Sequence, residues 1–269
     1  MNIAITSPSP HSLFVSTLTN VLIQEGHRPK CMLFVRKSRG VELLKSVKET
    51  GYLATFGRLF RYYKIAHSKT KSKDLHYYLG KYSRSHNINN WDMPIPEICR
   101  KEGIPCIRID NANSDRTIGY LKSMDIDILI YGGGGGILRK NIINTPRTGI
   151  LLAHKGPLPA YRGTGCVEWP LFYGDRVGVT VIFLDEGIDT GDIILSRDAS
   201  IEPGDTLASL YDKLEVTRIE LLAASVTLLA DDSVKRAKQS PDNGKQYFAM
   251  HPRLKRYVEK NLQRYDYIV

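Results

Sequence analysis

A histidine at the end of an apolar run is the first residue in this chain that could do chemistry. The stretch GILLAHKGPLPAYRG, at 149–163, ends its apolar part in His154 and continues into a loop rich in proline and glycine. The apolar run predicts a strand, and open α/β sheets form ligand crevices at the carboxyl ends of their strands. By itself, His154 is open to two interpretations: a catalytic group, or a buried histidine with satisfied hydrogen bonds.

Three aspartates occupy a turn between two later apolar runs. The stretch FLDEGIDTGDIIL, at 183–195, contains Asp185, Asp189 and Asp192. Their spacings of four and three residues do not suit a calcium loop, which needs alternating ligands. Asp and Gly favour turns for conformational reasons alone, but an aspartate here can also pair with His154 in acid–base chemistry.

A run of five glycines, at 132–136, follows a predicted strand and resembles a phosphate-binding loop in its placement. A dinucleotide fingerprint that starts at Gly132 needs a glycine where Ile137 stands, and one that starts at Gly133 meets Leu138. No Gly-Lys-Ser/Thr follows. The run is therefore either a flexible strand-to-helix turn or a place where the backbone approaches a ligand closely.

Taken together, the two motifs resemble the signature of the folate-dependent formyltransferase family. The pattern is His, Leu-Pro-x-Tyr-Arg-Gly, Gly-Val-Thr and Asp-x-Gly-x-Asp-Thr-Gly-Asp, within AHKGPLPAYRGTG and GVTVIFLDEGIDTGDIIL. The family includes glycinamide ribonucleotide, methionyl-tRNA and nucleotide-sugar amine formyltransferases. The resemblance is dense over 126–201 and implies an α/β fold with an open, mostly parallel, Rossmann-like sheet. It also implies 10-formyltetrahydrofolate as co-substrate.

The resemblance assigns roles to individual residues. In the family an acceptor amine attacks the formyl carbon and a tetrahedral oxyanion forms; His154 would stabilise that charge or move a proton, and Asp189 would orient the histidine and tune its charge. The implied pterin pocket consists of Ile130, Tyr131, Gly132, Gly133, Gly134, Leu138, Leu184, Asp185, Glu186 and Gly187. The residues expected to meet the acceptor are Lys155, Gly156, Tyr161, Arg162 and Thr164. No metal is implied.

Two positions depart from the family pattern. The family carries an asparagine two residues before the histidine, where this chain has Leu152, and a serine after it, where this chain has Gly156. An apolar side chain cannot donate to an oxyanion, and loss of one such donor costs about 10²–10³ in rate. A backbone amide of the glycine run, Lys155 or Thr164 could substitute. The alternative is a degenerate member that binds folate or a partner without standard formyl transfer.

The motifs need a sheet to position them, and the chain predicts one. Apolar runs typical of strands lie at 2–6, 30–35, 105–109, 126–133, 148–154, 177–185 and 191–201. Apolar residues at helical spacing lie at 12–26, 95–103, 114–124, 137–144, 167–174 and 206–231. Strand–helix–strand alternation predicts a parallel sheet. Ser114 or Asp115, and Asp205 or Thr206, are the expected helix caps.

We expect one α/β domain at 1–231, with a basic insertion at about 39–88, and a short basic extension at 232–269. The insertion is predicted to combine helices with a mobile loop around 68–73, and the extension to end in a helix at 252–265. Methionyl-tRNA enzymes of the family carry a substantial C-terminal RNA-binding domain, so the short extension disfavours that acceptor.

The net charge of +10 is concentrated around the insertion. Residues 27–88 carry 15 Lys and Arg against 3 Asp and Glu, interleaved with tyrosines. Such a segment can be a solvated basic face or can meet an anionic partner. We expect a small anionic amine acceptor, such as a nucleotide-linked amino sugar, or an amine on an acidic carrier protein. Nucleic-acid binding is the disfavoured alternative.

Composition sets the remaining expectations. The four cysteines form no CxxC pair, so neither a zinc site nor a disulfide framework is predicted. The beginning of the sequence lacks the pattern of a signal peptide, and no apolar stretch approaches the ~20 residues that span a bilayer. We therefore expect a cytoplasmic protein with reduced thiols and no membrane segment. The oligomeric state is left open.

Overall fold

Seven strands build the sheet that positions the two motifs. The computed structural model describes residues 1–35, 73–134 and 136–262. The main sheet has the strand order β3-β2-β1-β4-β5-β7-β8. In chain order its strands are β1 (Ile3–Ser7), β2 (Cys31–Val35), β3 (Cys106–Ile109), β4 (Ile128–Ile130), β5 (Gly149–His154), β7 (Gly178–Phe183) and β8 (Ile193–Asp198). The strands from β3 to β5 are parallel, and β7 and β8 continue the sheet antiparallel. The expected mostly parallel α/β fold is confirmed.

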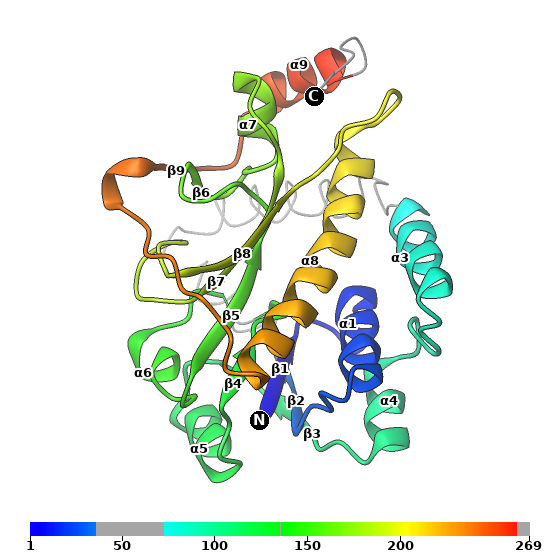
Figure 1. Ribbon diagram of the computed structural model, residues 1–269, viewed down its shortest axis with the longest axis vertical. Coiled ribbons are helices and arrows are strands. Elements are labelled where there is room, and N and C mark those ends of the chain that lie inside the picture. Colours follow the sequence, from blue (N-terminus) through cyan, green and yellow to red (C-terminus); the bar gives the residue numbers. More distant parts are fainter. Residues whose placement is uncertain (36–72, 135, 263–269) are drawn as a thin grey trace, which may run out of the picture.

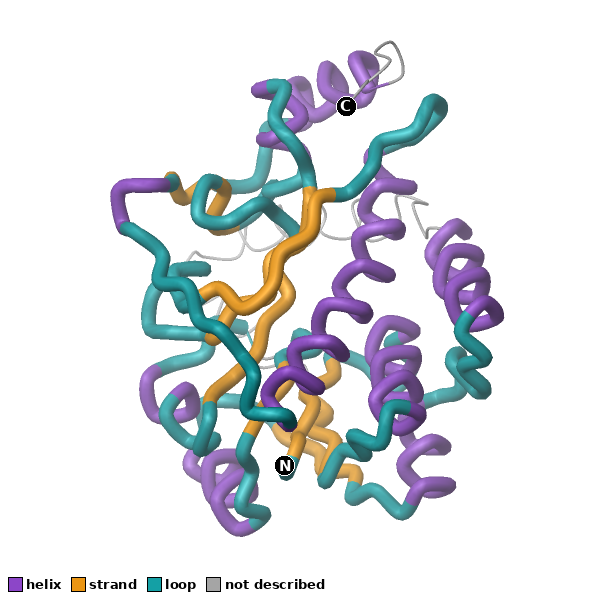
Figure 2. Tube along the Cα trace, viewed as in Figure 1, coloured by secondary structure: helices purple, strands orange, loops and turns teal. Residues whose placement is uncertain are grey.

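Helices cover both faces of this sheet. They are α1 (Leu13–Gln24), α3 (Lys73–Ser85), α4 (Ile95–Glu102), α5 (Asp115–Ser123), α6 (Lys140–Ile143), α7 (Glu168–Tyr173), α8 (Leu207–Ala230) and α9 (Pro252–Leu262). In Figure 1, α1, α3 and α8 lie on one side of the sheet and α5 and α6 on the other. Figure 2 shows the strands between these two groups. The helix α8 packs on β5, β7 and β8 as well as on α1 and α3, so it supports the strand that carries His154.

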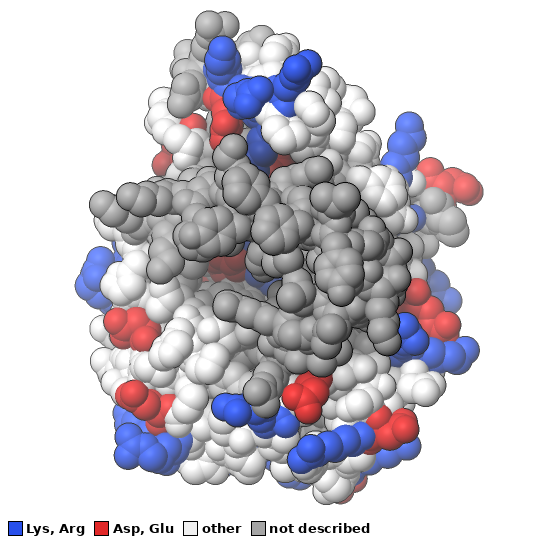
Figure 3. Space-filling model, turned by 180° about the vertical axis from the view of Figure 1, so that it is seen from behind, with Lys and Arg blue, Asp and Glu red and all other residues white. Residues whose placement is uncertain are grey.

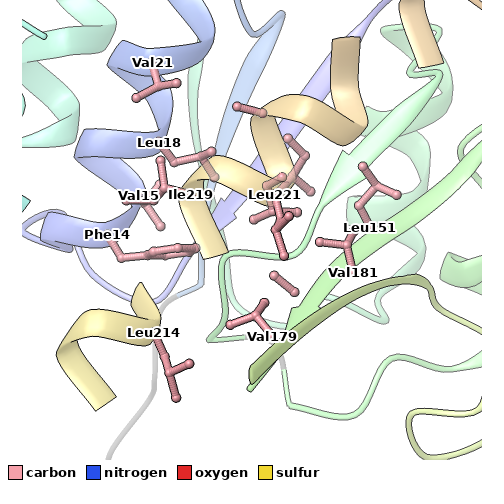
Figure 4. Close-up of a cluster of buried hydrophobic side chains, with 14 of the residues drawn as sticks. Phe14, Val15, Leu18, Val21, Leu151, Val179, Val181, Leu214, Ile219 and Leu221 are labelled. Carbon is pink, nitrogen blue, oxygen red and sulfur yellow. The ribbon is translucent and has the colours of Figure 1, made fainter. Parts of the chain in front are cut away.

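Alternation along the strands sends side chains into two separate cores. Ile3 and Ile5 of β1 join a cluster with α1 and α8, whereas Ala4 between them joins a cluster with α5 and α6. Strand β5 repeats this pattern, with Leu151 in the first cluster and Ile150 in the second. Figure 4 shows the first cluster, where Leu151 and side chains of β7 meet those of α1 and α8. Because both faces are buried, the strands read as continuous apolar runs.

The expected helix caps are found. Ser114 caps α5 by accepting a hydrogen bond from an amide of its first turn. Thr206 caps α8 and forms a reciprocal capping box with Ser209. Asp205, the other candidate for the cap of α8, instead forms an ion pair with Lys213, at 2.9 Å. The helix predicted at 137–144 is shorter than expected, since only α6 within it is helical.

The described part of the basic insertion is more ordered than its sequence pattern indicated. Expectations for 39–72 lie outside the described residues, as does most of the loop expected around 68–73. The helix α3 buries Leu79 fully, and Leu75 and Tyr82 pack on the same core. These residues recur at spacings of four and three and so form one apolar face, which packs on α8 and α1. The charged residues between them conceal this pattern in the sequence.

The tail after α8 folds back on the loop that follows β5. The short strand β9 (Lys245–Tyr247) pairs in parallel with β6 (Tyr161–Gly163). A 3-10 turn at Pro241–Asn243 precedes β9. The helix expected at 252–265 is confirmed as far as Leu262, and α9 packs on α7. Strand β9 was not expected, because three residues of mixed polarity carry no readable alternation. The division of the chain at 231/232 stays a prediction.

Candidate active site

Strand β5 delivers Leu152 and His154 to one face of the sheet. Successive strand residues point to opposite faces, so Leu151 and Ala153 join the core beneath α8 and Leu152 and His154 point the other way. Strand β4 pairs with β5 only as far as Leu151. The end of β5 therefore projects beyond its neighbour, at the carboxyl edge where open α/β sheets bind their ligands.

The turn between β7 and β8 carries Asp189 to this strand end. Asp189 has a φ of 55°, in the left-handed region that Asp and Asn adopt more readily than other side chains. The turn is held by Asp185, whose Oδ1 accepts from the Gly187 amide at 3.1 Å and from the Thr190 hydroxyl at 2.7 Å. Asp185 therefore shapes the turn, and Asp189 is left to face β5.

His154 and Asp189 form a buried pair. His154 Nδ1 lies 3.4 Å from Asp189 Oδ2, and His154 Nε2 lies 2.9 Å from the Tyr161 carbonyl oxygen. The same Asp189 oxygen accepts from the Gly163 amide at 2.8 Å. His154 is only 8% exposed. The structure thus brings together the two residues to which the motifs assigned catalysis; their roles remain a prediction.

The surroundings of this pair favour a neutral ring. Burial lowers the pKa of His154, the Asp189 carboxylate and the Tyr161 carbonyl oppose this effect, and the Arg218 guanidinium adds to the lowering. A neutral ring with its proton on Nε2 donates to the Tyr161 carbonyl and presents the Nδ1 lone pair to Asp189. A second proton taken up here would lie between Nδ1 and the carboxylate. The pair can therefore accept a proton and return it.

Gly156 is required by the packing of His154. A Cβ at this position would lie 2.8 Å from His154 Nε2 and 2.7 Å from the Cβ of Cys166. The Gly156 carbonyl accepts from the Thr180 hydroxyl of β7 at 2.9 Å. The loop after β5 is thus drawn over the imidazole, and a side chain at Gly156 would push the two apart.

A cavity of about 140 Å³ opens beside the pair. Its walls include five residues of the predicted pterin pocket, together with Leu152 and Asp189: Tyr131, Leu138, Leu184, Asp185 and Gly187. His154 does not line the cavity; it lies behind Asp189. The cavity suits a flat, largely apolar ligand, and the Asp189 carboxylate of the protein would stand at one end of that ligand.

The first glycines of the run serve packing. A Cβ on Gly132 would meet the Thr6 carbonyl oxygen at 2.2 Å, and one on Gly134 would meet Pro8 Cα at 2.7 Å. Gly133 also lies against Pro8. These three residues, predicted to line the pterin pocket, allow β4 to continue close to the loop after β1. They are not among the lining residues of the cavity, whereas Gly136 is.

Two other predicted pocket residues also lie apart from the cavity walls. Ile130 is fully buried in β4, and Glu186 is exposed and forms an ion pair with Lys140 at 3.0 Å. The walls instead include Ile137 and Ile143, which sequence reasoning did not select. The apolar positions of ILRKNII, directly after the glycines, were the signal that could have found them.

Two residues expected to meet the acceptor are engaged with the protein. The Tyr161 hydroxyl donates to Asp175, and burial together with that carboxylate raises the pKa of Tyr161. Arg162 is buried and donates to the Gln239 side chain and, at 3.0 Å, to the Ser240 carbonyl. Arg162 thus anchors the tail to the loop after β5, whereas Tyr161 ties that loop to Asp175 between α7 and β7. A role of either residue toward the acceptor stays a prediction.

The remaining acceptor residues differ in exposure. Lys155 forms an ion pair with Glu215 at 2.5 Å, and its ammonium lies over the ring of Tyr211. Thr164 is exposed, and its amide donates to the Tyr247 carbonyl. Of the three substitutes considered for the missing asparagine, the glycine run therefore comes nearest to the cavity, through Gly136.

A larger cavity, of about 600 Å³, lies at the same edge of the sheet. Its walls come from the loop after β1, from the end of β2, from Pro96 of α4, and from Cys106 and Arg108 of β3. Arg108 gives this cavity a positive charge. Across residues 1–35, 73–134 and 136–262, no group of three or more His, Cys, Asp or Glu is placed to hold a metal ion. None of the helices described here is long and apolar enough to cross a membrane.

Comparison with known sequences places these motifs in a family. The Formyl transferase family model matches residues 90–226, just over half of the chain. A methionyl-tRNA formyltransferase of Clostridium tetani is 33% identical over 175 residues, covering 64% of this chain and 56% of the relative. One from Thermodesulfovibrio yellowstonii is 34% identical over 133 residues, covering 49% and 43%. The chain thus spans about half the length of the curated relatives it matches.

Solved structures share the fold. A sugar N-formyltransferase from a Shewanella species superposes with a TM-score of 0.57 at 15% identity, covering 92% of this chain and 76% of that one. Glycinamide ribonucleotide transformylase 1 from Symbiobacterium toebii superposes with a TM-score of 0.58 at 16% identity, covering 88% and 94%. Since the family model matches over half of its residues, and the two motifs meet at the edge of this sheet, the chain belongs to the formyl transferase family.

Proposed function

We propose that this chain transfers a formyl group from 10-formyltetrahydrofolate to an amine of a small anionic acceptor. The observation that carries the proposal is the buried pair of His154 and Asp189, of which Asp189 lines the wall of a largely apolar cavity, within a chain of this family. Tyr131, Leu138 and Leu184 suit the faces of a flat pterin ring. The folate would supply the activated formyl carbon.

The roles of the pair follow from its geometry. An attacking amine must lose a proton, and the formyl oxygen gains negative charge as the new C–N bond forms. When this tetrahedral intermediate collapses, the bond from the formyl carbon to the folate nitrogen breaks, and that nitrogen takes up a proton as tetrahydrofolate leaves. Asp189 stands at the cavity wall and is the nearer acceptor for the amine proton. His154 stands behind it and can share that proton through Nδ1. The family's asparagine, which would donate to the oxyanion, is replaced here by Leu152. Among the groups that could donate in its place, a backbone amide near Gly136 lies nearest to the cavity.

Charge supports an anionic acceptor. The larger cavity carries Arg108 at the same sheet edge as the pair. At the opposite end of the molecule from β3 (Figure 1), Arg253, Arg256 and Lys260 of α9 are exposed, and Figure 3 shows Lys and Arg side chains gathered at that end. A nucleotide-linked amino sugar, or an amine on an acidic carrier protein, fits such surroundings.

Leu152 favours a second candidate function, the binding of a folate without turnover. It stands two residues before His154 on the same face and lines the cavity. Its isobutyl group offers apolar contact to a bound ring and no hydrogen bond to a developing oxyanion.

Calorimetry and turnover separate these candidates. Binding of 5-formyltetrahydrofolate is measured first, and then formyl transfer from 10-formyltetrahydrofolate to a panel of nucleotide-linked amino sugars, glycinamide ribonucleotide and methionyl-tRNA. We expect folate binding and transfer to an anionic amine. Absence of binding to any reduced folate would overturn both candidates, and binding without transfer to any member of the panel would favour the second. Unchanged transfer by His154→Ala would overturn the mechanism.

A further inference from the structure

The strand end that carries His154 is held by charged residues of α8. Arg218 Nε donates to the Ala153 carbonyl at 2.9 Å, and Arg218 Nη1 lies 2.7 Å from Glu215 Oε2. The other carboxylate oxygen of Glu215 lies 2.5 Å from Lys155 Nζ. The residues directly before and after His154 are thus tied to a single turn of α8. We call Arg218, Glu215 and Lys155 the α8 clamp.

Arg218 supplies a donor that the sheet does not. The Leu151 carbonyl accepts from the amide of Tyr131, the residue that follows β4, at 2.8 Å. Carbonyls two residues apart on a strand point the same way, so that of Ala153 points past the end of β4. A buried carbonyl without a donor is costly. The guanidinium of Arg218 therefore extends the hydrogen bonding of β5 by one step, up to the residue before His154.

The clamp is largely buried, and its one carboxylate pairs with both of its cations. The side chains of Arg218, Glu215 and Lys155 are 13%, 15% and 22% exposed. Arg218 also lies over the ring of Phe14, 4.2 Å from its centre. Buried ion pairs lose much of their Coulomb gain to desolvation. An apolar residue of the same helix, such as Leu214, packs in the core without that cost. Directional bonds to the strand are what the charged residues add.

We propose that Arg218 and Glu215 are positioning residues for His154: Arg218 holds the backbone carbonyl before it, Glu215 orients Arg218 and holds the side chain of Lys155 after it, and together they set the distance from His154 to Asp189. This inference rests on the proposed function, in which that pair handles the amine proton. Arg218 and Glu215 lie on α8, on the side of β5 opposite to the cavity. Neither of these two residues would therefore touch the folate.

Arg218 reaches the ring electrostatically as well. The charged groups that act on His154 are Asp189, from the turn after β7, and Arg218, from α8; the first raises and the second lowers the pKa of His154. Removal of the guanidinium charge is therefore expected to raise the pKa of His154, while a lysine at the same place preserves the charge but not the planar donor fork.

The test compares three variants. Arg218→Met removes charge and donors at similar length, and Arg218→Lys keeps the charge alone. Glu220→Gln is the matched control, because Glu220 lies on the same helix and pairs with Arg197 of β8 instead of with β5. For each protein we would measure kcat, the KM for the folate donor, thermal stability, and the His154 ring titration by NMR, assigned from the signal lost in His154→Gln.

We expect Arg218→Met to lower kcat by about 10- to 100-fold, as a misplaced catalytic group does, with little change in KM. Its His154 titration should move to higher pH. Arg218→Lys should restore the titration but only part of kcat, and Glu220→Gln should match the wild type in both. An unchanged kcat and titration in folded Arg218→Met would overturn the inference, as would an equal loss of kcat in Glu220→Gln.

The ring titration also separates this inference from the proposed function. If the wild type transfers no formyl group but Arg218→Met still moves the His154 titration and Arg218→Lys restores it, the proposed function fails while the structural coupling stands. If the wild type is active and no clamp variant alters kcat, the clamp inference is overturned and the proposed function stands. Should Arg218→Met not fold, Glu215→Gln serves in its place, and unchanged kcat and titration in that variant would overturn the clamp.

Discussion

The two faces of β5 show how one strand serves chemistry on one side and support on the other. On the cavity side, Leu152 lines a small, largely apolar slot, and His154 contacts Asp189, which lines the same slot. On the α8 side, Leu151 and Ala153 are packed in the main core. A shift of one residue in register would exchange the two sets.

The faces also differ in how their charges are satisfied. On the cavity side, the pair of Asp189 and His154 consists of one carboxylate and one imidazole, with a proton that can move between them. The α8 side holds a fully paired set, Lys155 with Glu215 and Glu215 with Arg218. A reacting pair needs a charge that can change, whereas a support needs charges that do not. This comparison predicts that substitutions on the cavity side mainly change the rate of formyl transfer. Substitutions that disturb packing should mainly change the free energy of unfolding.

The largest effect is expected from Asp189→Asn. The amide still accepts from the Gly163 backbone, so the turn should stay folded, but it cannot take a proton. Single-turnover assays should show formyl transfer reduced by about 10²–10⁴, the usual contribution of a general base. Asp198→Asn is the control, since Asp198 is an exposed β8 residue paired with Arg176. Equal activity in the two variants would contradict the assignment.

The next effect concerns Leu152→Asn. The new amide would point into the cavity beside Asp189 and could donate to the formyl oxygen. A gain of about 10²–10³ in single-turnover rate is expected if the slot lacks a donor. A rate equal to that of the wild type, with folate affinity preserved, would instead indicate that a backbone amide of the glycine run already donates.

A smaller effect, on stability, is expected from Gly156→Ala. The added methyl would lie within 3 Å of both His154 and Cys166, and overpacking of this kind costs about 1–3 kcal/mol. Chemical denaturation measures the change. Gly119→Ala in α5 is the matched control, because a Cβ there meets nothing within 4 Å and alanine favours a helix. A Gly156→Ala protein as stable as the wild type would show that the loop relaxes freely.

The smallest effect is on the pH dependence of stability. The folded-state pKa of His154 is lowered below its unfolded value, which is about 6.5. The unfolded chain therefore binds more protons in that window, and stability is lost as the pH falls from about 6.5 toward the folded pKa. Denaturation of His154→Gln at several pH values should show a weaker loss over this window. An identical slope in both proteins would mean that folding does not change the pKa of His154.

Local patterns explain why much of the site could be read in advance. Strand and helix periodicities place β5 and β7 correctly, and the resemblance of the two motifs to the family signature points to His154 and Asp189. The pocket was predicted only in part. Gly132 and Gly134 were assigned to a ligand, yet they allow β4 to pass close to Thr6 and Pro8. A glycine run in a sequence does not reveal which neighbour requires it.

The clamp illustrates what periodicity does not reveal. Glu215 and Arg218 stand three residues apart on a predicted helix, a spacing that indicates an ordinary intrahelical ion pair. That Arg218 reaches the Ala153 carbonyl depends on β4 ending one step too early, and the two residues are 65 apart in the chain. Strand β9 was missed for the same reason, because its partner β6 lies far away in the sequence.

The sequence by itself determined the alternating α/β order and the family motifs, because these depend on residue types and on spacing along the chain. The resemblance that those motifs carry selected His154 and Asp189 as the residues predicted to share a proton. The tertiary structure alone decided that Asp189 lines the cavity while His154 stands behind it. It also decided that Leu152 is part of that wall and that α8 holds the strand end. Those facts depend on contacts between segments distant in the chain, and such contacts are settled by packing and by the need to pair buried polar groups.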